Sequence, residues 1–155
     1  MSKESSGKDP TSAEAFSERE RAALKDRAAE LKTEARRSRS ADKAAADEAD
    51  VLEKISQMPE EDRRLAEKVH ALVTLAAPEL APKLYYGQPA YARNGKIVCF
   101  FRSGQGDKER YSTFGFGVEA KLDDPTGLWP TAYALTDLSD AAWETLSELV
   151  TRAAS

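Results

Sequence analysis

The sequence has few of the residues from which metal centres and nucleophilic active sites are built. Its 155 residues include one cysteine, Cys99, and one histidine, His70. A single cysteine excludes a disulfide within the chain, and this usage is typical of a reducing cytoplasm. A zinc site needs about four such ligands. We therefore expect Cys99 to be a small core residue inside an apolar strand and His70 to be a solvated or partly covered surface histidine.

Long apolar runs are also missing. No stretch approaches the ~18 residues that a membrane helix requires, and the N-terminal MSKESSGKDP lacks the apolar segment of a signal peptide. The 23 basic and 27 acidic residues nearly balance, for a net charge of −4, which argues against general binding to polyanions. We therefore expect a cytoplasmic protein with neither a membrane nor a nucleic-acid partner.

Aromatic side chains are nearly absent from the first half of the chain, where only Phe16 precedes Tyr85. Residues 1–15 are rich in polar and small side chains with almost nothing to bury, so we expect them to be disordered. Residues 16–50 are rich in Ala, Glu, Lys, Arg and Asp and are predicted to form a charged helical extension. Residues 51–155 carry the remaining aromatics and form the main domain.

The extension begins with a helix-start signal. Ser17 and Glu20 match the capping-box pattern, with Phe16 ahead of them as a candidate staple residue. Leu24 and Leu31 are its only large apolar side chains, and one leucine every two turns makes a stripe too narrow to bury much surface. Such a helix docks lightly on the main domain or on another molecule, and we expect a protein partner for it.

The charges of this helix are arranged unfavourably in isolation. Asp26, Glu30 and Glu34 follow one another at intervals of four, which places like charges on neighbouring turns. The basic run at 36–40 is expected to end the helix. Acidic residues 30 and 34 also dilute the adjacent basic cluster, so phosphate binding is not expected there.

Two further helices are predicted before the aromatic region. The first spans about residues 41–57, with Val51, Leu52 and Ile55 on its inward side. The second follows Pro59, has three acidic residues in its first turn, and carries apolar residues at core spacing until Pro78.

After residue 82 the pattern changes to short extended segments. Strands are predicted at 83–86, 90–93, 97–101, 111–116 and within 128–135. Asn94-Gly95 is the strongest two-residue hairpin signal, and Asp137 or Ser139 is expected to cap a final helix. Helices followed by strands and a last helix predict an α+β fold, with helices packed on one face of a small, mainly antiparallel sheet.

The segment YYGQPAY, residues 85–91, is the densest cluster of aromatic residues. Gly87 is free to adopt unusual backbone angles and Pro89 restricts Gln88, so we expect Gly87-Gln88-Pro89 to be a rigid bend flanked by Tyr86 and Tyr91. Two interpretations stay open. The phenols either fill the seam between sheet and helices, or Tyr86, Gln88 and Tyr91 line a binding pocket.

Four short motifs resemble the YdhG-like domain family. They are Met58-Pro59-Glu60, Ala77-Pro78-Glu79, Tyr86-Gly87-Gln88-Pro89-Ala90-Tyr91 and Asn94-Gly95-Lys96, in that order and at similar spacing. The chain departs from the family at Gln88, where methionine is usual, and its Ala/Glu/Arg-rich extension is similar to that of actinobacterial relatives.

The resemblance covers about residues 51–152 and implies an α+β domain of bacterial origin. Some members of that family are described as frataxin-like iron chaperones, which implies a role in binding or delivering iron. Weakly bound iron accepts oxygen ligands, and Asp140, Glu144 and Glu148 are spaced by four along the last helix. These three are our candidate metal ligands, and a solvated acidic helix face is the other interpretation.

Motifs for catalysis are missing. The sequence has no Gly-x-Ser-x-Gly elbow, no dinucleotide fingerprint and no phosphate-binding loop. We therefore expect a non-enzymatic protein. The first hypothesis is an iron-binding or iron-delivery protein, and the alternative is a small-ligand- or protein-binding module that uses the Tyr86–Tyr91 segment without a metal.

Overall fold

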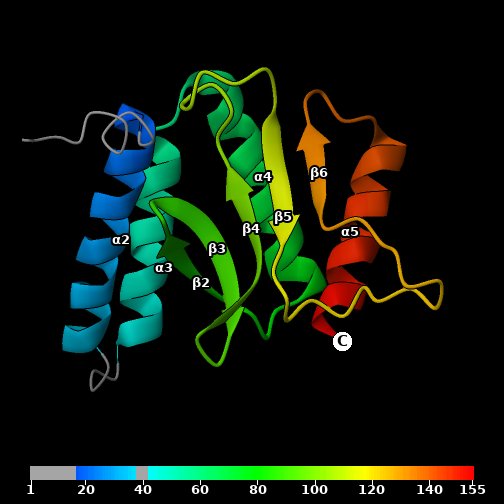
Figure 1. Ribbon diagram of the computed structural model, residues 1–155, viewed down its shortest axis with the longest axis horizontal. Coiled ribbons are helices and arrows are strands. Elements are labelled where there is room, and N and C mark those ends of the chain that lie inside the picture. The colour runs from blue at the N-terminus through cyan, green and yellow to red at the C-terminus, as the bar shows by residue number, and fades with distance from the viewer. Residues whose placement is uncertain (1–16, 38–41) are drawn as a thin grey trace, which may run out of the picture.

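The computed structural model describes residues 17–37 and 42–155, and its helices and strands are shown in Figure 1. The helices are α2 (Glu18–Arg37), α3 (Lys43–Ser56), α4 (Glu60–Ala76) and α5 (Asp140–Ala154). The strands are β2 (Ala81–Tyr85), β3 (Gln88–Arg93), β4 (Lys96–Arg102), β5 (Ser112–Phe116) and β6 (Ala132–Leu135). None of the helices in the described residues is long and apolar enough to cross a membrane.

The five strands form one antiparallel sheet in the order β2-β3-β4-β5-β6, which confirms the predicted α+β class. The Asn94-Gly95 hairpin is also confirmed, since both residues have positive φ, 52° and 80°. The bend expected at Gly87-Gln88-Pro89 lies one residue earlier. Tyr86 and Gly87 form the turn, whereas Gln88 and Pro89 already belong to β3.

The sheet has two different faces. On the core face, Tyr91 pairs with Cys99 and Phe101 with Phe114, and all four side chains are buried. The opposite face carries five side chains whose strand positions alternate with those of the core face: Lys83, Tyr85, Gln88, Phe100 and Arg102. The fold therefore separates the predicted aromatic cluster onto two surfaces.

Three helices bury apolar side chains together with the core face. In Figure 1, α3 stands beside β2, α4 passes behind the sheet and α5 stands at the β6 end. Each helix contributes apolar residues at helical spacing to one continuous core, namely Val51 and Ile55, Val69 and Val73, and Leu146 and Val150. Leu52, predicted to point inward, is 49% exposed, because it lies a quarter turn away from Val51.

Helix α3 crosses the boundary that the composition predicted at residue 51. Its C-terminal half supplies Val51 and Ile55 to the core, so α3 belongs to the main domain. Only α2 remains as an extension, and it lies beside α3 next to the β2 edge (Figure 1). Residues 1–16, expected to be disordered up to residue 15, and 38–41 lie outside the described residues.

The predicted starts of α2 and α5 are confirmed. Ser17 Oγ accepts a hydrogen bond from the N–H of Glu20, and Glu20 Oε1 accepts one from the N–H of Ser17, the complete capping box. Ser139 caps α5 by accepting from the N–H of Ala142. The predicted strand within 128–135 is shorter than expected and starts at Ala132, after Pro130.

Candidate functional site

The turn between β2 and β3 places a bulky residue in a left-handed backbone conformation. Tyr86 has φ 52° and Gly87 has φ 77°. These angles are close to those of the Asn94-Gly95 turn between β3 and β4. Asparagine adopts this conformation readily, whereas a residue with a large side chain pays about 1 kcal/mol or more. The chain therefore places tyrosine at a position where asparagine would be more stable, which indicates a use for the ring.

Helix α2 places a carboxylate on this turn. The N–H of Tyr86 donates to Glu30 Oε1 at 2.9 Å, and the N–H of Gly87 donates to Glu30 Oε2 at 2.6 Å. Both oxygens are thus used by consecutive backbone donors, a short, charge-assisted arrangement. A side chain at Gly87 would collide with the carboxylate of Asp26, so glycine is required there by φ and by the neighbouring helix.

Two further contacts hold α2 on the same turn. The guanidinium of Arg27 lies 4.7 Å from the ring centre of Tyr85 and 5.6 Å from that of Tyr86, two cation–π contacts. The rings themselves meet edge to face at 4.7 Å. Arg27 Nη1 is 3.6 Å from Glu30 and has no hydrogen-bond partner among the described residues, so its position depends on charge and on the rings.

A buried lysine completes this set of contacts. Lys83 lies in β2 with 10% of its side chain exposed, and its ammonium is paired with the carboxylate of Glu34. Glu34 follows Glu30 by one helical turn, so the two like charges that disfavour an isolated helix each meet a donor on the sheet. We call Glu30, Glu34 and their partners Tyr86, Gly87 and Lys83 the carboxylate clasp.

The position of Glu30 changes its acid–base properties. Partial burial raises the pKa of its carboxyl above the ordinary 4.5, while the hydrogen bonds from Gly87 and Tyr86 and the charge of Arg27 oppose this rise. The charge of Asp26 adds to it. Burial prevails, so the docked carboxyl holds its proton more tightly than a free one.

A groove continues from the clasp along the outer face of the sheet. It measures about 900 Å³. Its floor consists of Tyr85, Tyr86, Gln88, Phe100 and Arg102, and its wall is the N-terminal half of α2. Phe100 lies over Gly115, which lacks a side chain at the point where the ring rests. Aromatic rings with a few polar groups at the rim are typical of binding surfaces.

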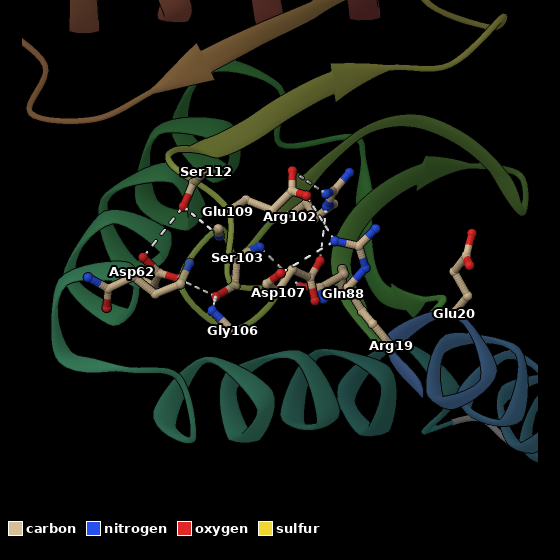
Figure 2. Close-up of polar contacts among 12 residues, drawn as sticks. Arg19, Glu20, Asp62, Gln88, Arg102, Ser103, Gly106, Asp107, Glu109 and Ser112 are labelled. Atoms are coloured by element: carbon tan, nitrogen blue, oxygen red, sulfur yellow. Dashed lines mark hydrogen bonds and ion pairs between the residues drawn. The ribbon is translucent and has the colours of Figure 1, made fainter. Parts of the chain in front are cut away.

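The loop at the far end of the groove is anchored by a buried carboxylate. Figure 2 shows Asp62, in the first turn of α4, accepting hydrogen bonds from the hydroxyls of Ser103 and Ser112. It also accepts one from the N–H of Gln105, at 2.8 Å. Asp62, one of the three acidic residues in the first turn of α4, therefore also fixes the loop of residues 103–111.

The same loop is tied to α2 by ion pairs. Arg102 contacts Asp107 at 3.0 Å and Glu109 at 2.8 Å, and Arg19 contacts Glu109 at 2.9 Å (Figure 2). Gln88 Oε1 lies 3.4 Å from the N–H of Ser103. Helix α2 therefore spans the groove, held at one end by the clasp and at the other by Glu109.

The structure does not bring the three predicted ligand-binding residues together. Tyr86 and Gln88 both line the groove, but Tyr91 is 1% exposed and points into the core from the other face. Its hydroxyl lies 3.0 Å from His70 Nδ1, and His70 Nε2 lies 3.3 Å from Glu48. His70, predicted to be solvated or partly covered, is partly buried and belongs to a hydrogen-bonded chain that links α3, α4 and β3.

Cys99 is buried in the core, as predicted. Desolvation raises the pKa of its thiol to about 12, as suits a core residue rather than a nucleophile or ligand. Desolvation likewise raises the pKa of the Tyr91 phenol.

The candidate metal ligands lie on the outer side of α5. Asp140, Glu144 and Glu148 are all exposed, and the part of the chain that the structure describes places no group of three or more Asp, Glu, His or Cys side chains so as to hold a metal ion. Iron binding at these residues stays a prediction.

Sequence reasoning also missed a second groove of about 860 Å³ between α4, the 103–111 loop and α5. It is lined by Leu65, Tyr111, Leu138 and Trp143, with Lys68 5.3 Å from the ring centre of Trp143.

Comparisons of the chain with family models, with curated proteins and with solved structures found no match in any of the three. The resemblance to the YdhG-like family therefore rests on the four motifs alone.

Replacing Asp62 should loosen the loop and the fold. We expect Asp62→Ala to lower the free energy of unfolding by about 2–4 kcal/mol, because buried hydroxyl and N–H donors lose their acceptor. Urea denaturation measures the change. Glu67→Ala is the matched control, since Glu67 is exposed on the same helix and should cost no more than about 0.5 kcal/mol. Equal losses in both variants would contradict the anchoring role of Asp62.

The raised pKa of Glu30 gives its own contribution to α2 docking a defined pH dependence. Since the docked form binds the proton more tightly, the contribution of Glu30 is largest below pH 4.5 and weakens as the pH rises through the raised pKa. Carboxyl carbon chemical shifts should give Glu30 a higher pKa in the full chain than in a free peptide of residues 17–34. Identical pKa values in the two would show that the carboxyl is not buried against the turn.

Proposed function

We propose that this protein is a non-enzymatic protein-binding module that recognises a helical segment on the outer face of its sheet. The observation that supports this most directly is the pair of hydrogen bonds from Tyr86 and Gly87 to the Glu30 carboxylate. The two donors lie 56 and 57 residues after Glu30 in the sequence, so this contact joins distant parts of the chain. It uses backbone donors that face away from the core.

The way in which α2 is held also supports binding to a helix. Its contacts with the sheet are made by charged side chains and aromatic rings rather than by an apolar stripe. Among these residue types, aromatic residues and arginine are enriched at protein interfaces. A small molecule alone would not need a row of receptors that matches successive helical turns. Of the two functions expected from the sequence, the metal-free binding module thus has the better structural support.

The strained turn supports the same proposal. Natural proteins break local rules at functional sites and compensate elsewhere. Tyr86 occupies a backbone conformation that suits asparagine, and its ring contacts Tyr85 and Arg27. The ring therefore contributes to holding the helix rather than to the stability of the hairpin.

A peptide added in trans tests the proposal. In full-chain Glu30→Lys, α2 should leave the turn, and an unlabelled peptide of residues 17–34 with the natural sequence should then bind there. Binding is measured by amide chemical shifts of Tyr86 and Gly87 in the isotope-labelled variant. Glu53→Lys is the matched control, because it makes the same charge change at an exposed position of α3 and should leave α2 docked.

A second variant separates loss of binding from loss of folding. Adding Tyr86→Asn to the Glu30→Lys chain should preserve or increase stability, since it relieves the strained turn, yet weaken peptide binding about 2- to 30-fold through the lost ring contacts. Thermal denaturation monitors the fold. Unchanged Tyr86 and Gly87 shifts at ~1 mM peptide, or equal binding with asparagine at position 86, would contradict the proposed function.

A further inference from the structure

The receptor half of the carboxylate clasp consists of one cation and two backbone donors. Lys83 is almost fully buried while α2 is docked, and there its ammonium is best paired with an anion. The consecutive N–H groups of Tyr86 and Gly87 donate to Glu30 in the docked state. If α2 moved away without replacement, these groups would have only water to pair with. The sheet thus presents two separate receptors for carboxylates.

The spacing of the two receptors matches one helical turn. Glu30 reaches the turn N–H groups and Glu34 reaches Lys83 from the same face of α2, because residues four apart lie above one another on a helix. Arg27, three residues before Glu30, stacks on the tyrosine rings. The clasp therefore reads the pattern Arg-x-x-Glu-x-x-x-Glu on a helix.

Helix α2 is attached through contacts that another helix can remake. Leu24 and Leu31, its large apolar side chains, are 47% and 51% exposed and contribute little burial. What remains are ion pairs and hydrogen bonds, and a segment with the same pattern would restore each of them, so the exchange leaves no buried charge without a partner. Elements held in this way open at low free energy compared with the core.

We propose that the clasp binds an acidic helical segment of a partner protein that carries Arg-x-x-Glu-x-x-x-Glu, and that α2 is a built-in competitor for this segment. This inference rests on the proposed function and adds the sequence pattern that the site selects. Because the partner must first displace α2, its apparent affinity falls by the fraction of molecules in which the clasp is free.

The test uses an alanine-based helical peptide that contains only the Arg-x-x-Glu-x-x-x-Glu pattern. Its control has the same composition, with the second glutamate moved by two residues to the opposite side of the helix. Both are titrated into the labelled full chain and into the full-chain double variant E30Q/E34Q, in which α2 loses both charges. Circular dichroism and thermal denaturation check that the double variant is folded.

We expect the pattern peptide to bind the double variant at least tenfold more tightly than the natural chain, and at least tenfold more tightly than the control peptide. Equal binding of the two peptides would overturn the inference and leave the proposed function standing. If neither these peptides nor the peptide of residues 17–34 binds, the proposed function fails as well.

Sedimentation of the natural chain distinguishes a second copy from another protein as the source of the segment. A concentration-dependent dimer that is abolished by E30Q/E34Q would assign the clasp to α2 of a second copy and would overturn the proposal of a separate partner. A monomer over the same concentration range is the expected result.

Discussion

The placement of α2 on the sheet depends on one interaction, the binding of the Glu30 carboxylate by the N–H groups of Tyr86 and Gly87. This contact explains why α2 lies over the β2–β3 turn although it has little apolar surface to bury there. Both residues of this turn have positive φ, which suits glycine at position 87, where Asp26 of α2 also lies close. With Glu34 and Lys83 the Glu30 contact turns a helix of unfavourable charge spacing into a well-matched ligand for the sheet.

The fold could be predicted from local signals because those signals agree with the tertiary structure. The Asn94-Gly95 pair, the Ser17/Glu20 capping box and the Ser139 cap each determine the backbone within a few residues. Errors arose where packing decides. The side chain of Leu52 fits an apolar pattern but lies to the side of the buried stripe, and the β2–β3 turn moved by one residue because strand pairing favours Tyr86-Gly87 over Gly87-Gln88.

The site was only partly predictable, since its parts are distant in sequence. The YYGQPAY segment identified the turn, but the alternation of strand side chains, which places Tyr91 in the core and Gln88 in the groove, depends on the register. The spacing of Glu30 and Glu34 indicated a repulsion between like charges. The groups on the sheet that bind these two carboxylates could not be predicted from the sequence. A comparison of the two hairpins offered one signal: tyrosine stands at position 86 where the other turn has Asn94.

Amide hydrogen exchange measures the central contact directly, and the second hairpin provides an internal reference. In the full chain, the amides of Tyr86 and Gly87 should exchange far more slowly than those of Asn94 and Gly95, which occupy the same turn positions without a carboxylate from α2. Equal exchange rates in the two turns would contradict the account, because they would show that Glu30 does not hold the turn in solution.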